Sequence, residues 1–384
     1  MPLAGIRLLD LSRHLPGPFL TRTLADLGAD VVKVESPQGD WARYLPPFVA
    51  DQSTAFAALN WGKRSIVLDL KKAEGREMVL ALVEVVDVVV ESFRPGVLDR
   101  LGLGADVLME RNAALIVCSL SGYGQAGPFA SVPGHDINYM ARSGVLSLFG
   151  PANGPPPPPG VQVADIGGGL HGAVAILAAL YQRHTTGRGR RLDISLCNSA
   201  ASFGMFEHAR RVGDKESRGS GILTGGRPGY RVYETQDGEF MALGALEPKF
   251  FNAFCKRAGC EHLVGKGMTM GEEGAETMAQ LETIFASHTR DEWVGLLSGC
   301  DCCCEPVLSP EEAATETGLP TVSVAGNEFL AVDLGAPCGA RHQDVPMLGE
   351  HGMEVARELQ LDPELVERAV ACGAFWEDSD GGQI

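Results

Sequence analysis

Short apolar segments alternate with amphipathic segments along the first half of the chain. The apolar segments predict buried strands and lie at residues 6–11, 31–34, 65–70, 87–93 and 113–122. A helix with Leu20 and Leu24 on its apolar side follows the first strand and ends at Gly28. Further helices are predicted at 71–86 and, as two short ones, within 96–112. This alternation predicts an α/β fold whose large domain is a doubly wound parallel sheet, with ligands at the carboxyl ends of its strands.

The second half of the chain has a different pattern. A helix of small apolar residues, a strand and another helix extend the large domain to residue 209, and 210–229 are rich in Gly, Ser and charge, as in a linker. A hairpin that turns at Asp237-Gly238 is followed by helices near 247–258, 275–287 and 290–298. We therefore expect a large domain over 1–209, a smaller α+β domain over 230–330, and a segment 331–384 that returns to the large domain. The tail from Trp376 onward is expected to fray.

Composition narrows the range of partners. The chain has a net charge of −17, which disfavours nucleic acid and anionic membranes as partners of the whole surface. Basic residues nevertheless fall near the predicted strand ends, where a phosphorylated ligand could bind: Lys63, Arg64, Lys71, Lys72, Arg94 and Arg100. No secretory signal and no apolar run of about 18 residues is evident in the sequence. We expect a cytoplasmic protein, with an organelle matrix as the alternative.

The ten cysteines include a cluster at Cys300 and Cys302 to Cys304. Neighbouring side chains of an extended segment point to opposite faces, so these four thiols are poorly arranged to bind one ion. No paired Cys-x-x-Cys motifs occur in the sequence. We therefore expect free, partly buried thiols and no metal site.

Three residues are candidates for proton chemistry, and each has a structural alternative. His135 follows a helix-opening glycine and can exchange a proton near neutral pH, but a histidine in this position can also simply bond a neighbouring carbonyl. Asp165 precedes three glycines, which indicate a turn where a ligand comes close to the backbone and whose N–H groups could hold an oxyanion, yet an aspartate before a helix is most often its N-cap. Glu247 lies between a strand and a helix, where an acidic residue commonly complements the helix dipole.

Several motifs resemble one known family over nearly the whole chain. The segments "LADLGADVVKVESP", "ESFRPGVLDRLGLG", "SLSGYGQAGP", "GRGRRLDISL" and "VPMLGEHGMEV" are similar in content and order to the family III CoA-transferase (CaiB/BaiF-like) superfamily. "GHDINY" (134–139), "DIGGG" (165–169) and "GALEPKFF" (244–251) resemble its α-methylacyl-CoA racemase branch. The chain departs from its relatives at Ser36, where an arginine is frequent, and at Asn60-Trp61, where Asn-Arg is frequent.

The resemblance implies a function and a set of site residues. It implies that His135 and Asp165 are two catalytic bases, that Glu247 orients His135, and that the Asp136 backbone N–H belongs to an oxyanion site. The residues that the resemblance implies for binding CoA and the thioester are Asp69, Leu70, Lys71, Ser92, Phe93, Arg94, Arg100, Gly134, Asp136, Ile137, Asn138 and Tyr139. It also implies an acyl-CoA substrate and an interlocked homodimer. No cofactor is expected, because two bases on opposite faces can invert a carbon next to a thioester.

Two other functions remain open from the sequence. A CoA-transferase of the same superfamily would need only Asp165, as a nucleophile that forms an anhydride and then an enzyme-bound thioester. A non-catalytic acyl-CoA-binding protein would need neither base.

Overall fold

The computed structural model describes residues 1–49, 51–210, 212–213, 218–316, 318–324, 326–330 and 344–376. The chain forms two compact units, one of residues 1–143, 160–203 and 320–384, the other of residues 144–159 and 204–319. The second unit thus begins before the linker expected at 210–229 and also takes in 144–159, which the sequence analysis had assigned to the large domain. The tail expected to fray, beyond Trp376, lies outside the described residues.

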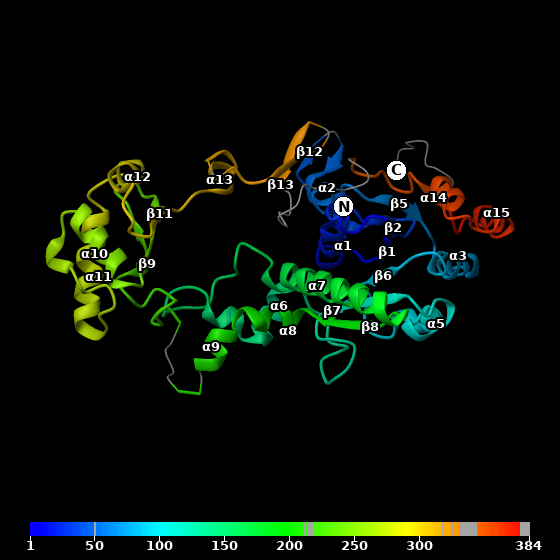
Figure 1. Ribbon diagram of the computed structural model, residues 1–384, viewed down its shortest axis with the longest axis horizontal. Helices are drawn as coiled ribbons and strands as arrows, with labels where there is room; N and C mark the ends of the chain where they lie inside the picture. The colour runs from blue at the N-terminus through cyan, green and yellow to red at the C-terminus, as the bar shows by residue number, and fades with distance from the viewer. Residues whose placement is uncertain are drawn as a thin grey trace. The chain divides into compact units, whose positions relative to one another are not determined.

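A six-stranded parallel sheet forms the centre of the first unit (Figure 1). Its strands are β1 (Arg7–Leu11), β2 (Asp30–Glu35), β5 (Arg64–Val67), β6 (Val88–Glu91), β7 (Ile116–Ser121) and β8 (Arg191–Ser195). They lie in the order β5-β2-β1-β6-β7-β8, and Leu9 of β1 pairs with Val32 on one side and Val89 on the other. The predicted doubly wound parallel sheet is confirmed. The chain leaves β1 toward one edge and returns to β6 on its other side, which makes the β1–β6 boundary the topological switch point.

Helices cover both faces of this sheet. On one face, a core formed by the strands also includes Met78 of α3 (Ala73–Val83), Leu108 of α5 (Ala105–Arg111), Val355 of α14 (Gly352–Glu358) and Val366 of α15 (Pro363–Ala371). The C-terminal helices therefore pack on the first unit. The other face is covered by α1 (Pro16–Asp26) and α7 (Val163–Thr186), which pack against each other. The other elements of this unit are η1 (Trp41–Tyr44), β3 (Phe48–Val49), β4 (Gln52–Ser53), α2 (Thr54–Asn60), α4 (Val97–Arg100), α6 (Asp136–Ser143), α8 (Leu196–Phe203), β12 (Thr321–Val324) and β13 (Asn327–Leu330).

The three glycines after Asp165 lie inside α7 and do not form a turn, which corrects the sequence-based expectation. A Cβ on Gly169 would stand 2.9 Å from the Pro16 carbonyl oxygen, and one on Gly168 2.2 Å from the Leu196 side chain. The glycines therefore let α7 approach α1 and α8 closely. The elements that approach the backbone at these glycines are therefore α1 and α8 of the protein, and not a ligand.

Helix α7 is also long and apolar enough to cross a membrane, by length and composition only. The sequence analysis had found no such run. In the structure one side of this helix packs against α1, α8 and the strands β7 and β8, whereas Val174 and Tyr181 of the helix are exposed.

The second unit contains an antiparallel sheet in the order β11-β10-β9, covered by helices. Strands β9 (Tyr230–Glu234) and β10 (Phe240–Gly244) form the predicted hairpin, which turns at Gly238 with φ +78°. The three predicted helices are present, and Phe254, Phe285 and Trp293 stack in the core between them. Its elements are η2 (Val145–Leu148), α9 (Met205–Arg210), β9, β10, α10 (Pro248–Arg257), η3 (Glu261–Leu263), α11 (Gly271–Phe285), α12 (Arg290–Leu297), β11 (Cys304–Pro306) and α13 (Pro310–Glu316).

The cysteine cluster lies at the start of β11. Cys302 and Cys304 are buried in the core of the second unit, whereas Cys303 between them is exposed. The segment is not extended as the sequence analysis assumed, since Cys303 has a left-handed backbone with φ +50°, and all four thiols are free.

Candidate active site

Two cavities open at the carboxyl ends of the parallel strands. The first has a volume of about 360 Å³ and is lined by the ends of β1, β2 and β5. The second, about 480 Å³, is lined by the segments that follow β1, β6 and β7 and by the start of α7. Arg13 and Phe93 line both cavities, so the two adjoin at the switch point between β1 and β6. This is where α/β folds of this kind bind ligands.

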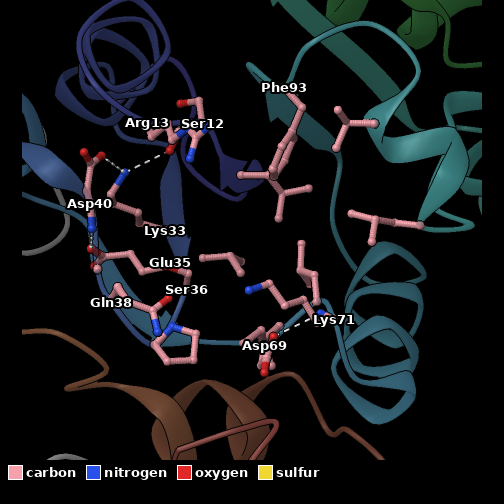
Figure 2. Close-up of a pocket in the computed structure, with 18 residues that line it drawn as sticks. Ser12, Arg13, Lys33, Glu35, Ser36, Gln38, Asp40, Asp69, Lys71 and Phe93 are labelled. Atoms are coloured by element: carbon pink, nitrogen blue, oxygen red, sulfur yellow. Dashed lines mark hydrogen bonds and ion pairs between the residues drawn. The ribbon is translucent and has the colours of Figure 1, made fainter.

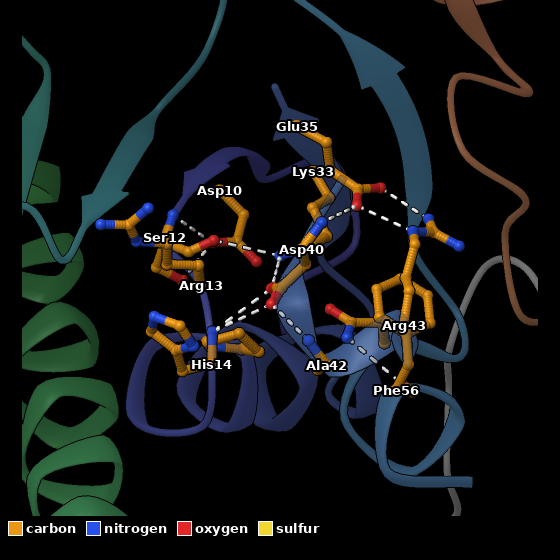
Figure 3. A network of polar contacts seen from close by, with 12 residues as sticks. Asp10, Ser12, Arg13, His14, Lys33, Glu35, Asp40, Ala42, Arg43 and Phe56 are labelled. Carbon is orange, nitrogen blue, oxygen red and sulfur yellow. Dashed lines mark hydrogen bonds and ion pairs between the residues drawn. The ribbon is translucent and has the colours of Figure 1, made fainter. Parts of the chain in front are cut away.

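A buried network of charges holds the loop that separates the two cavities (Figure 3). Lys33 donates a hydrogen bond to the Ser12 carbonyl at 3.0 Å and forms an ion pair with Asp40 at 3.0 Å. The Asp40 carboxylate also accepts the His14 N–H at 3.3 Å. His14 has φ +69°, a left-handed conformation that is uncommon outside glycine. Three fixed contacts thus position the loop 12–14 at the switch point.

The network continues to a second buried lysine. Lys63 pairs with Asp10 at 3.1 Å, and both side chains are fully buried. Burial alone would raise the pKa of Asp10, but Lys63 and Lys33 lower it to about 2. Burial lowers the pKa of Lys63 to about 8, with Asp10 opposing the shift. The pair is therefore ionised at neutral pH and structural in role.

Two of the basic residues that we expected at the ligand edge are consequently occupied elsewhere. Lys63 is 1% exposed in the network just described, and Arg64 is fully buried and bound to Asp30 at 2.7 Å. Lys72 donates a hydrogen bond to the Cys372 carbonyl. Arg100 is exposed and lines neither of the two cavities.

Of the two remaining basic residues, Lys71 lines the first cavity (Figure 2) and Arg94 the second. Asp69, Leu70 and Lys71 line the first cavity together, and the Asp69 carboxylate accepts the Lys71 N–H at 3.0 Å. Ser36 and Gln38, which follow β2, also line this cavity. Within the described residues Lys71 forms no ion pair, and among the cations that line this cavity it shares this property only with Arg13. The cavity can therefore offer a positive charge to an anionic group.

His135 stands at the rim of the second cavity. Its side chain is exposed, and within the described residues no hydrogen bond involves its ring. Its backbone instead caps α6, because its carbonyl accepts the Asn138 N–H at 2.8 Å while its own N–H donates to the Asn138 side chain at 3.0 Å. A buried packing role for the imidazole is thus inconsistent with the structure, and the ring is free to meet a ligand.

Asp165 lines the same cavity from the first turn of α7. It is therefore not the N-cap of this helix, a position that Gln162 occupies. Burial, together with the neighbouring Asp136 carboxylate, raises the pKa of Asp165 to about 7. A carboxyl group with this pKa can be present as acid or as base near neutral pH.

Tyr139 and its neighbours shape the wall between these two residues. The Tyr139 hydroxyl donates a hydrogen bond to the Gly134 carbonyl, and a Cβ on Gly122 would collide with the ring at 2.3 Å. Burial and then the Asp165 charge raise the pKa of Tyr139 to about 12, so this phenol stays neutral. The residues predicted for the CoA or thioester site that line this cavity are Ser92, Phe93, Arg94, Gly134, Asn138 and Tyr139.

Asp136 and Ile137 do not line the cavity, but they begin α6 beside it. Their backbone N–H groups have no acceptor within the described residues, as is usual for the first residues of a helix. They are available to an oxyanion. The glycine amides after Asp165, which the sequence analysis had also offered for this role, lie inside α7, where helical hydrogen bonds engage them.

Glu247 lies in the second unit. It is exposed and occupies the N-cap position of α10 without a side-chain capping bond. The orienting contact to His135 that the resemblance implies stays a prediction.

Sequence reasoning missed two residues of this region. Arg13 lines both cavities and His14 lines the second, yet neither was selected. The available signal was their place directly after the first strand, in "DLSRHLPGP", at the switch point of the fold.

Comparison with known proteins agrees with this geometry. The model of CoA-transferase family III matches residues 3–324. The chain is 37% identical to the alpha-methylacyl-CoA racemase of Mus musculus over 95% of both chains, and 33% identical to the succinyl-CoA:glutarate CoA-transferase of the same species over 97% of this chain and 90% of the relative. The crystal structure of a CAIB/BAIF family protein from Brucella suis superposes with a TM-score of 0.82 at 30% identity, covering 94% of this chain and 99% of that one. The chain is thus an enzyme of the family III CoA-transferase superfamily.

Proposed function

We propose that the protein is a racemase that interconverts (2R)- and (2S)-2-methylacyl-CoA thioesters by proton transfer between two bases. The observation that carries the proposal is that one cavity presents both a free imidazole, His135, and a carboxyl group, Asp165, whose pKa is raised to about 7. A transferase nucleophile needs no imidazole beside it. Two proton-transfer groups at one cavity are what inversion of a carbon acid requires.

The substrate would span the two adjoining cavities. The nucleotide end of CoA would occupy the first cavity near Lys71, and the thioester would reach the second past Arg13 and Phe93. A cation suits a phosphate group, and the ring of Phe93 lies at the shared wall, where the chain of the ligand would pass.

The reaction follows from the two bases. One base removes the α-proton from one face of the thioester, and its electron pair passes into an enolate. The other base, in its protonated form, returns a proton to the opposite face. The negative oxygen of the enolate would be stabilised by the Asp136 and Ile137 N–H groups at the start of α6. No metal or organic cofactor is needed for these steps.

The second candidate function is CoA transfer between carboxylic acids. It is favoured by the 33% identity to a succinyl-CoA:glutarate CoA-transferase. In that reaction the ionised Asp165 would attack the thioester carbonyl, forming a mixed anhydride with the acyl group and expelling CoA as its thiolate. Its raised pKa disfavours the ionised form below neutral pH.

His135→Ala separates the two functions. The racemase proposal predicts that this variant loses inversion of (2R)-2-methylacyl-CoA by at least about 100-fold, because one of the two bases is missing. His171→Ala is a matched control, since His171 is on α7 and lines neither cavity. The proposal is contradicted if His135→Ala inverts the substrate as fast as the wild type does. It is also contradicted if the main activity is transfer of CoA to added succinate and His135→Ala carries out this transfer at an undiminished rate.

A further inference from the structure

The side chain of Asp136 connects the two helices that carry the candidate bases. Its Oδ1 accepts the Ala164 N–H at 2.7 Å and the Asp165 N–H at 3.0 Å. Asp136 is the first residue of α6, directly after His135, whereas Ala164 and Asp165 belong to the first turn of α7. One carboxylate oxygen therefore fixes the start of α7 to the residue beside His135.

Asp136 supplies the side-chain capping bonds that the N-cap residue of α7 does not make. The N-cap residue Gln162 makes no side-chain capping bond. The first N–H groups of a helix need acceptors, and a side chain from a distant segment here supplies one for two of them. The contact also brings a second carboxylate next to that of Asp165.

This arrangement affects the charge that Asp165 can carry. A carboxylate in the first turn of a helix is normally stabilised by free N–H groups and by the helix dipole. In α7 the Asp136 oxygen already occupies two of those N–H groups, and no donor within the described residues bonds the Asp165 carboxylate. The negative charge of Asp136 acts in the same direction, since like charges disfavour ionisation.

We propose that Asp136 is a positioning residue that keeps Asp165 able to hold a proton at neutral pH, by occupying the α7 amides and by placing a like charge beside it. The proposal rests on the proposed two-base function, because only proton donation by Asp165 gives this effect a catalytic use. It assigns to the Asp136 side chain a role separate from that of its backbone N–H.

Other charged and titratable groups line the second cavity together with Asp165, and they are unchanged in the Asp136 variants described below. They come from α6 and from the segments that follow β1 and β6: His135, Tyr139, Arg13, His14 and Arg94. Burial is the largest cause of the raised pKa of Asp165, with Asp136 second. Removing the charge of Asp136 should therefore shift the titration of Asp165 only in part.

The test compares Asp136→Asn with Asp136→Ala. The asparagine keeps an oxygen that can accept the two α7 amides and removes only the charge, whereas alanine removes both. Asp362→Asn is the control, because the Asp362 side chain caps α15 through the Glu364 N–H and lines neither cavity. For each variant, kcat/KM for 2-methylacyl-CoA is measured from pH 5 to pH 9, and the Asp165 carboxyl is titrated by ¹³C NMR with Asp165→Asn for assignment.

We expect Asp136→Asn to move the Asp165 titration about one pH unit lower. The basic limb of the kcat/KM profile should move with it in the direction of reaction in which the protonated Asp165 donates the proton. Asp362→Asn should leave both unchanged. An Asp165 titration that does not move in Asp136→Asn overturns the proposal, whatever the enzyme catalyses. A shifted titration with no racemase activity in the wild type would instead refute the proposed function and leave the electrostatic role of Asp136 standing.

Discussion

Replacing Asp165 with Asn should stabilise the fold in a manner that depends on pH. The carboxyl group titrates near pH 3.8 in an unfolded chain and near 7 in the folded protein. Because the folded-state pKa is raised, the protonated group contributes its full stability below about pH 4, and this contribution is lost as the pH rises through 7. Asparagine resembles the protonated carboxyl in shape and carries no charge, so it avoids this loss.

The size of the effect follows from the shift. One pKa unit corresponds to about 1.4 kcal/mol, so the shift of roughly three units costs the wild type about 4 kcal/mol once Asp165 is ionised. At pH 5 the raised pKa destabilises the wild type by only about 1.6 kcal/mol, because the carboxyl group is still protonated in the folded protein at that pH. Partial exposure of the side chain reduces both values, and we expect the stability advantage of Asp165→Asn to grow by about 2 to 3 kcal/mol between pH 5 and pH 8.

Urea denaturation of both proteins at pH 5, 6, 7 and 8 measures this difference. The free energy of unfolding should be taken from a probe in the first unit, since the two units can unfold separately. Tryptophan fluorescence of a chain that lacks Trp293 is such a probe, because Trp41, Trp61 and Trp376 all belong to the first unit. Asp362→Asn, which replaces an exposed helix cap, provides the comparison. A stability difference that stays constant over this pH range would refute the raised pKa and with it the idea that Asp165 can serve as an acid at neutral pH.

Three further predictions concern packing, buried charge and ligand binding. Gly169→Ala should lower the free energy of unfolding by about 1 to 3 kcal/mol, because the added Cβ collides with α1. The control Gly295→Ala places its Cβ in open space and should be neutral or stabilising. Both variants are compared by thermal denaturation, and equal effects would contradict this packing argument. Lys63→Met should lower the free energy of unfolding by about 3 to 5 kcal/mol, because it leaves Asp10 buried without its ion-pair partner. Adding Asp10→Asn should recover most of that loss, and a double variant as unstable as the single one would contradict the role of the ion pair. Lys71→Ala should raise KM for the acyl-CoA about tenfold with kcat nearly unchanged in steady-state assays, and an unchanged KM would remove Lys71 from the CoA site.

Most of the fold could be predicted from the sequence, because its signals are local. Strands such as β6 and β7 are buried along their whole length and therefore read as largely apolar runs, and the hairpin at Asp237-Gly238 has a turn with a known sequence signature. The boundary between the units was less accessible. Residues 144–159 join the second unit through contacts with a distant part of the chain, which a local pattern does not record.

The site could be predicted only in part, for a similar reason. His135 and Asp165 were found, and the structure places both on one cavity. The glycines after Asp165 were misread as a ligand-binding turn, because a sequence does not distinguish close approach of a ligand from close approach of another helix. The contact of Asp136 with the start of α7 joins residues 28 positions apart in the chain and has no sequence signature.

Exchange of the α-hydrogen with solvent tests the central claim most directly. The purified wild-type protein is incubated with (2R)-2-methylacyl-CoA in D₂O without any acceptor acid, and the α-hydrogen is followed by NMR and the product by chiral analysis. The two-base account predicts deuterium at the α-carbon together with appearance of the 2S form. Absence of exchange, with CoA moving to a free acid once one is added, would contradict it and make Asp165 a nucleophile.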